Sequence, residues 1–199
     1  GTNTSVEKPG GYFESGHFFP IIERNTIIPV SRVERLYTIK ENQKKISVEI
    51  LQGESRRASE NILLGELSVS IPPSPKGEQA IDVRYTYDIN GILEVEVTVV
   101  STGDKKKIVI QKNPGYMSEE EVENRLDELS ELKIHPREKA ENKHLLARGE
   151  RMYEECVGHK RMLIEEALRK FENILDKQEP REIERGILRR QCGGSHESL

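Results

Sequence analysis

The sequence predicts an antiparallel β-sandwich followed by a helical region. Up to about residue 112, apolar side chains alternate with polar ones between turn residues, which is typical of strands. From Ser118 onward, apolar residues recur at the three- and four-residue spacing of helices. No helical pattern separates the strands, so a sandwich is favoured over a parallel sheet with crossover helices. The change between the two patterns falls near Asn113-Pro114-Gly115.

Eight segments have the period of a strand: residues 12–14, 18–23, 33–40, 45–52, 66–71, 80–88, 91–100 and 105–111. The polar stretch 41–44 predicts a hairpin that joins the third and fourth of them. Residues 88–91 and 101–104 have the composition of tight turns, because Asn and Gly tolerate positive φ. The proline-rich stretch 71–77 predicts a loop that cannot join a ladder.

The helical region begins with a capping box, in which the Ser118 side chain and Glu121 satisfy each other's backbone N–H groups. Val122, Leu126 and Leu129 then fall on one helical face. Pro136 fits the first turn of a second helix. A glycine costs only about 1 kcal/mol inside a helix, so the periodicity leaves open whether residues 136–178 form one helix or a hairpin.

Composition excludes several classes of protein. The 199 residues are 34% hydrophobic and 33% charged, with a net charge of −4 and only 5% aromatic residues. This balance argues against binding to nucleic acid, which favours basic surfaces and aromatic stacking. No apolar run is long enough for a membrane span, and no signal peptide opens the chain. We therefore expect a cytoplasmic protein with no membrane partner, in which Cys156 and Cys192 are free thiols. Because the first residue is glycine, we also expect a fragment of a longer chain.

No catalytic or metal-binding pattern is present in the sequence. The five histidines have no ligand spacing with cysteine or carboxylate residues. Motifs for a nucleophilic triad, a phosphate-binding loop or a dinucleotide site are also missing. We expect the fragment not to be an enzyme and to hold neither cofactor nor metal.

The stretch from Leu36 to Arg57 is central to the prediction of function. Ile46, Val48 and Ile50 alternate with Ser47 and Glu49, so three β-branched side chains share one face of a strand. That face is either sandwich core or a binding site, and the pattern alone favours core.

Several motifs, in one order along residues 1–125, resemble the peptide-binding domain of the seventy-kilodalton heat-shock chaperones. They are Arg24-Asn25-Thr26-Ile27-Ile28-Pro29, Asn42-Gln43, Ile50-Leu51-Gln52-Gly53-Glu54, Leu64-Gly65, Pro75-Lys76-Gly77, Asp88-Ile89-Asn90-Gly91-Ile92-Leu93 and Asn113-Pro114-Gly115. The stretch 13–22 and the short helical region are most similar to the bacterial HscC branch of this DnaK-like family.

The resemblance implies a β-sandwich whose loops form a channel for an extended peptide, covered by a helical lid. It divides the chain into a peptide-binding domain (1–115), a lid (116–191) and a disordered tail (192–199). Ile46 would line the central pocket, surrounded by Leu36, Val48 and Ile81. Ser5 and Ile39 would arch over the peptide, and Thr4 and Tyr37 would offer backbone contacts.

The resemblance also implies partners and regulation. These partners are unfolded polypeptides with extended hydrophobic segments, the chain's own nucleotide-binding domain and a J-domain co-chaperone. ATP would bind only in the N-terminal domain, so this stress-response fragment would bind peptide without hydrolysing ATP.

Some positions depart from the family pattern. The arch has its bulk at Ile39 rather than at Ser5, and Lys143 of the lid would meet Lys76 as a like charge. A second latch would pair Ala147 with Glu41 and also fails. We therefore expect a lid that docks more loosely than that of DnaK. The alternative is an assembly module that forms a homodimer through its helices, with a channel occluded by Ile39.

Overall fold

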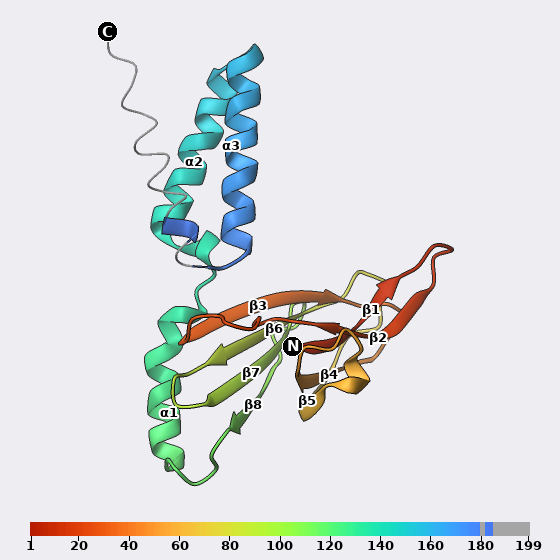
Figure 1. Ribbon diagram of the computed structural model, residues 1–199. Coiled ribbons are helices and arrows are strands. Elements are labelled where there is room, and N and C mark those ends of the chain that lie inside the picture. Colours follow the sequence, from red (N-terminus) through yellow and green to blue (C-terminus); the bar gives the residue numbers. More distant parts are fainter. Residues whose placement is uncertain (180–181, 185–199) are drawn as a thin grey trace. The chain divides into compact units, whose positions relative to one another are not determined.

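Two four-stranded antiparallel sheets face each other in the computed structural model, which describes residues 1–179 and 182–184 (Figure 1). The strand order is β2-β1-β4-β5 in one sheet and β3-β6-β7-β8 in the other. The strands are β1 (Thr2–Glu7), β2 (Phe13–Phe19), β3 (Val30–Tyr37), β4 (Lys45–Gln52), β5 (Ile62–Ser70), β6 (Ala80–Tyr87), β7 (Ile92–Val99) and β8 (Lys105–Gln111). The predicted β-sandwich is confirmed.

The sandwich core forms because each central strand turns one apolar face inward. Val83, Val95 and Val97 are fully buried, and Val83 lies directly opposite Val97 in the β6–β7 pair. The turn at residues 88–91 closes this hairpin as predicted, with Gly91 at a φ of 76°. β-Branched side chains fill such a pleated interior well.

The predicted hairpin of the third and fourth segments is wrong. β3 pairs with β6, whereas β4 pairs with β5 and, at one residue pair, with β1. The loop between them therefore crosses from one sheet to the other. A polar turn signal indicates that the chain reverses, but it does not specify which strand becomes the partner.

Strand bounds in the first sheet also differ from the periodic pattern. β1 is not among the segments that the periodic pattern predicts. β2 is one strand across the predicted segments 12–14 and 18–23, and β5 begins four residues before the predicted 66–71. Backbone pairing with β1 and β4 forms these strands, even though Ile62 and Leu63 remain exposed.

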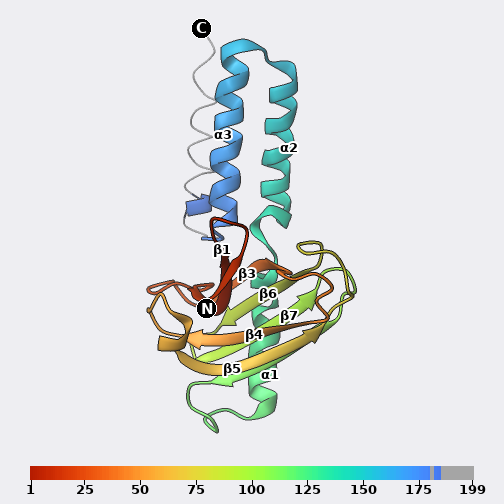
Figure 2. The same cartoon turned by 90° about the vertical axis from the view of Figure 1, so that its right-hand side faces the viewer.

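Helix α1 (Glu119–Glu128) and the 3₁₀ turn η2 (Leu129–Lys133) belong to the first compact unit, Gly1–Lys133, although they follow the last strand. The predicted capping box is present, because Ser118 Oγ accepts from Glu121 N and Glu121 Oε2 accepts from Ser118 N. Val122 and Leu126 pack on Ile92 at the outer face of β7. Figure 2 shows α1 behind the strands of this sheet.

The second unit starts at Ile134 and contains a helical hairpin. It begins with the 3₁₀ turn η3 (Pro136–Glu138), so Pro136 does not open the long helix as predicted. Helices α2 (Ala140–Glu155) and α3 (Gly158–Asp176) then lie side by side (Figures 1 and 2). The open question about residues 136–178 is thus resolved as a hairpin, which turns at Cys156 and Val157 in extended backbone.

Phe171, Leu175 and Ile183 form the core of this unit. Cys156 is a free thiol, as expected. The predicted tail 192–199 and Cys192 lie outside the described residues. Within the described ranges, no helix has the length and apolar character needed to cross a membrane.

Candidate functional site

The backbone ladder between β1 and β4 is short. Gly1 and Leu51 exchange two backbone hydrogen bonds, and Thr2 lies opposite Ile50. Antiparallel register would next set Thr4 opposite Val48, but the ladder stops, and in the described part of the chain the β4-facing edge of β1 has no further strand partner. An unpaired strand edge offers backbone donors and acceptors to another extended chain.

The four predicted pocket residues all belong to the main hydrophobic core of the sandwich or pack against it. Val48 and Ile81 are 2% and 0% exposed, and Leu36 and Ile46 are half-buried against the same core. Leu36 lies opposite Ile81 in the β3–β6 pair. Ile46 is therefore the more accessible of the two β4 side chains, and Val48 forms the layer behind it.

The other four predicted residues lie on segments around this core and are not part of it. Thr4 and Ser5 lie in the middle of β1. The pairing with β2 is irregular there, because β2 has one residue more than β1 between the pairs Thr4–His17 and Val6–Glu14. Tyr37 ends β3, the edge strand of its sheet, and its side chain is exposed. Ile39 follows in the crossing loop, where its backbone N–H donates to Gln43 Oε1 at 3.3 Å.

Hydrogen bonds hold the crossing loop, residues 38–44, against the proline-rich loop, residues 71–79. Thr38 is buried, its N–H donates to Gln79 O at 2.9 Å, and Gly77 N donates to Thr38 O at 3.0 Å. Asn42 N donates to Ser74 O at 3.0 Å, with Asn42 at a φ of 50°. These contacts make the backbone of Ile39 part of a braced pair of loops. The sequence pattern indicated both loops but not the bonds between them.

Lys76 joins the proline-rich loop to the β1–β2 hairpin. Its ammonium lies 4.4 Å from the centre of the Phe13 ring and 4.0 Å from Glu7 Oε1. Lys143, expected as its like-charged neighbour, forms its own ion pair with Glu138 at 2.7 Å in the second unit. Each lysine thus has a partner within its own unit.

A hollow of about 930 Å³ lies at the other end of the strands, between the last residues of β4 and the first of β7. Its apolar lining includes Phe18, Leu64, Tyr85, Leu93 and Ile110. None of the eight predicted site residues lines it. Burial raises the pKa of the Tyr85 hydroxyl, which donates a 2.8 Å hydrogen bond to the carbonyl of Gly1.

Two acidic residues of β7 are buried on the outer face of the sandwich, where alternation suggested exposure. Glu94 and Glu96 are 2% and 7% exposed because η2 brings Lys133 over them. Burial raises the pKa of Glu96, but the ammonium groups of Lys133 and Lys105 outweigh this effect and hold it below its ordinary value. The sequence contained one indication that this outer face is covered. The apolar stripe of α1 must pack against another surface, and that surface is the outer face of β7.

No group of three or more potential metal ligands occurs among the residues that the structure describes. The candidate site consists of apolar side chains beside the unpaired part of β1 and the edge strand β3, braced by two loops. Such a surface can bind an extended chain through backbone hydrogen bonds and one inserted side chain.

Comparison with known proteins identifies the family. The family model described as "Hsp70 protein" matches residues 8–187. The heat shock 70 kDa protein of Trichophyton rubrum is 36% identical over 129 residues, which cover 64% of this chain and 19% of that protein. Two proteins named chaperone protein DnaK are also similar. That of Mycoplasmopsis pulmonis is 36% identical over 132 residues (66% of this chain, 22% of the relative), and that of Methanothermobacter thermautotrophicus 37% over 127 residues (63% and 21%).

The chain spans about a fifth of the length of these relatives. The narrower assignment to the HscC branch stays a prediction. The family match runs through both the strands and the helical hairpin. The chain therefore belongs to the Hsp70 family.

Proposed function

We propose that this chain binds extended hydrophobic segments of unfolded polypeptides between β1 and the β3–β4 loop. The observation that carries the proposal is the separation of β1 from β4 beyond Thr2, next to the half-buried Ile46, in a chain of this family. A peptide would use the backbone at Thr4 and Tyr37. Ser5 and Ile39 would flank it on opposite sides.

One aliphatic side chain of the peptide would contact Ile46 and Leu36, with Val48 and Ile81 behind them. Burial of one leucine contributes about 1.5–3 kcal/mol. This gain is small, so binding would be weak and tolerant of sequence, since the backbone contacts are the same for every peptide. These properties suit capture of unfolded chains.

Fluorescence anisotropy with a short leucine-rich peptide tests the proposal. We expect Ile46→Asp to weaken binding by at least roughly tenfold, because a carboxylate in the pocket would lose its hydration when the apolar side chain enters.

The matched control is Ile89→Asp, at an exposed isoleucine of the β6–β7 turn. It should leave affinity unchanged. Equal binding by wild type and Ile46→Asp, or no binding by the wild type at high micromolar peptide, would contradict peptide binding at this site.

The longer protein would couple this site to ATP. By family resemblance, ATP binding and hydrolysis in a separate nucleotide-binding domain would set peptide exchange, with a J-domain co-chaperone, in a cytoplasmic setting. A lid that docks loosely would slow peptide release only a few-fold relative to a chain without the helical hairpin.

The alternative function, assembly through the helices, has one observation in its favour. Met152, Val157, Met162 and Leu163 are exposed around the turn of the hairpin. Light scattering on the full chain, together with the anisotropy measurement, distinguishes the two functions. An assembly module would be dimeric by light scattering and would not bind the peptide.

A further inference from the structure

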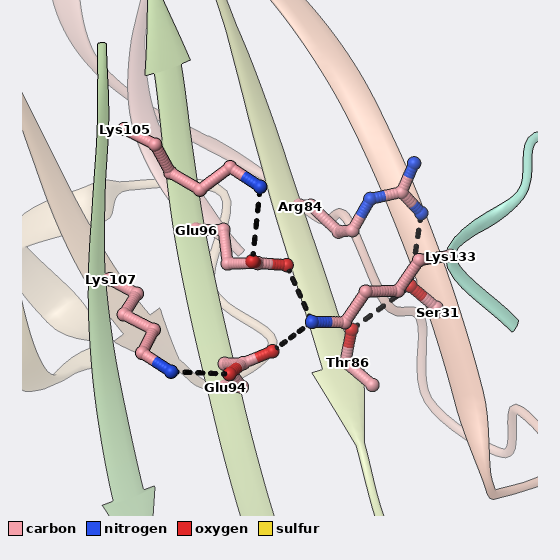
Figure 3. A network of polar contacts seen from close by, with 8 residues as sticks. All are labelled: Ser31, Arg84, Thr86, Glu94, Glu96, Lys105, Lys107 and Lys133. Atoms are coloured by element: carbon pink, nitrogen blue, oxygen red, sulfur yellow. Dashed lines mark hydrogen bonds and ion pairs between the residues drawn. The ribbon is translucent and has the colours of Figure 1, made fainter. Parts of the chain in front are cut away.

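An ion cluster fixes the end of the first unit to the outer face of β7. The ammonium of Lys133 lies between two carboxylates, 2.5 Å from Glu94 Oε1 and 2.9 Å from Glu96 Oε2 (Figure 3). Burial lowers the pKa of Lys133, but its hydrogen bonds to these carboxylates outweigh the burial and raise it above the usual value. The cluster therefore favours the charged form of Lys133.

Each of the two carboxylates has a second lysine nearby in addition to Lys133. Lys107 approaches Glu94 at 3.7 Å and Lys105 approaches Glu96 at 3.5 Å, both from β8 (Figure 3). Arg84 lies opposite Glu96 in the β6–β7 pair and donates to Ser31 at 3.0 Å. Removing one partner of a buried ion pair is normally costly because the other charge is left unpaired. Here Glu94 and Glu96 would keep lysine partners if Lys133 left.

Helix α1 and the η2 turn that follows it are attached to the sheet in different ways. Near its middle, Arg125 makes hydrogen bonds of 2.9 and 3.3 Å to the fully buried Asp88, and it is the one cation that contacts Asp88 in the described part of the chain. Val122 and Leu126 add apolar contacts there. Loss of this attachment would leave Asp88 buried without a cation, so α1 is held firmly.

The η2 turn lies against β3 as well as β7, but few of its side chains are covered. Leu129 is buried, whereas Leu132 and Ile134 are 37% and 50% exposed. A 3₁₀ turn has poorer hydrogen-bond geometry than an α-helix, and η2 with its five residues is longer than most such turns. Beyond Leu129, the ion pairs of Lys133 with Glu94 and Glu96 fix this turn to β7.

We propose that η2 is a releasable hinge and that Lys133 is its latch: the turn detaches from β7 while α1 stays in place, and Lys105 and Lys107 then neutralise Glu94 and Glu96. The second unit begins one residue after the latch, at Ile134. Release would thus lengthen the connection between the two units without unfolding the sandwich. On the proposed function, a longer connection would speed peptide exchange.

Hydrogen exchange of the full chain, followed by mass spectrometry, tests the hinge without any peptide. Lys133→Met keeps an unbranched side chain only one atom shorter and removes its charge. We expect amides of residues 129–134 to exchange roughly tenfold faster, the effect of losing a charged hydrogen bond. Amides of α1 should change by less than about twofold.

Lys105→Met is the matched control, because Lys105 also contacts Glu96 but comes from β8 and is 54% exposed. It should leave exchange in residues 129–134 unchanged. A double variant, Glu94→Gln with Glu96→Gln, should release η2 as Lys133→Met does, and adding Lys133→Met should have little further effect. Unchanged exchange in Lys133→Met, or equal acceleration in η2 and α1, would overturn the hinge.

Peptide release is the second readout and rests on the proposed function. We expect Lys133→Met to release a bound leucine-rich peptide several-fold faster than wild type, whereas Lys105→Met should not. Faster exchange at η2 with unchanged peptide release would overturn the link to peptide exchange. If the wild type bound no peptide, the proposed function would fail, and the exchange data would still decide the hinge.

Discussion

At the scale of residues, the buried carboxylate of Asp88 links the β6–β7 turn to α1. Asp88 also accepts from Asn90 Nδ2 at 2.9 Å. Burial raises the pKa of Asp88, but hydrogen bonds from Arg125 and from the backbone at Asn90 outweigh it, and the pKa lies below its ordinary value. A carboxyl group with a lowered pKa in the folded state stabilises the fold above its unfolded pKa. That stabilisation is lost as the pH falls through the folded pKa.

Asp88→Asn should therefore lower the free energy of unfolding by about 2 kcal/mol near neutral pH, where the charged hydrogen bonds to Arg125 count most. The difference from wild type should shrink between roughly pH 5 and pH 2, because the wild-type carboxyl then takes up a proton. Urea unfolding at a series of pH values measures this. Asp104→Asn, at an exposed turn residue, is the control. A wild-type advantage that stayed constant down to pH 2 would contradict the role given to Asp88.

The three β-branched residues of the β4 face are alike in type but differ in how exposed they are. Ile46, Val48 and Ile50 alternate in sequence, so their shared face could be predicted. Ile50 is fully buried and Ile46 is half-buried, because Ile50 lies where β1 pairs with β4 and Ile46 lies beyond that pairing. That difference depends on where β1 leaves β4, which no local pattern contains. The eight site residues therefore came from family resemblance, and their role in binding stays a prediction.

At the scale of elements, α2 and α3 approach closely at Gly149. A Cβ built there would lie 2.4 Å from Leu168 Cδ2, and Leu168 is itself buried. Below this point Arg137 ties η3 to the end of α3 through paired hydrogen bonds of 2.8 and 3.0 Å to Asp176. The absence of a side chain at residue 149 thus sets how near the two helices lie.

Gly149→Val should destabilise the hairpin by about 2 kcal/mol or more, because a branched side chain must displace Leu168 from its packing. Ala147→Val, at an exposed position of the same helix, introduces the same side chain and should cost only its helix propensity, about 0.6 kcal/mol. Hydrogen exchange in α2 and α3 measures the difference. Equal protection of the hairpin in the two variants would show that the contact at Gly149 is unimportant.

Elements with strong local signals could be predicted, and those that depend on distant partners could not. The capping box of α1 and the turn at residues 88–91 are encoded within a few residues, and both are present. The partner of β3 lies some fifty residues away in β6, so the polar turn after β3 was misread as a hairpin within one sheet. Gly158 has a φ of 60°, a conformation that favours glycine, but the spacing of apolar residues alone could not distinguish a turn from a tolerated glycine.

At the scale of the whole molecule, the change from strands to helices does not coincide with the division into compact units. The apolar stripe of α1 shows that a helix is present but not what it packs against. Because α1 and η2 cover Ile92 and Glu94, they complete the first unit, and the second unit starts only at Ile134. A fragment designed from the sequence pattern would end near Tyr116 and would leave this outer face bare.

Two truncations test this division. A chain ending at Lys133 should unfold cooperatively with the stability of the first unit in the full chain, because it keeps the contacts of Val122, Leu126, Arg125 and Lys133 with the sheet. A chain ending at Tyr116 should lose about 3 kcal/mol or more, since Ile92 becomes exposed and Asp88 loses its only described cation. Urea unfolding followed by circular dichroism gives both values. If the two truncated chains were equally stable, α1 and η2 would contribute nothing to the stability of the sandwich. Neither the contacts of Arg125 with Asp88 nor those of Lys133 with Glu94 and Glu96 would then hold these elements in place.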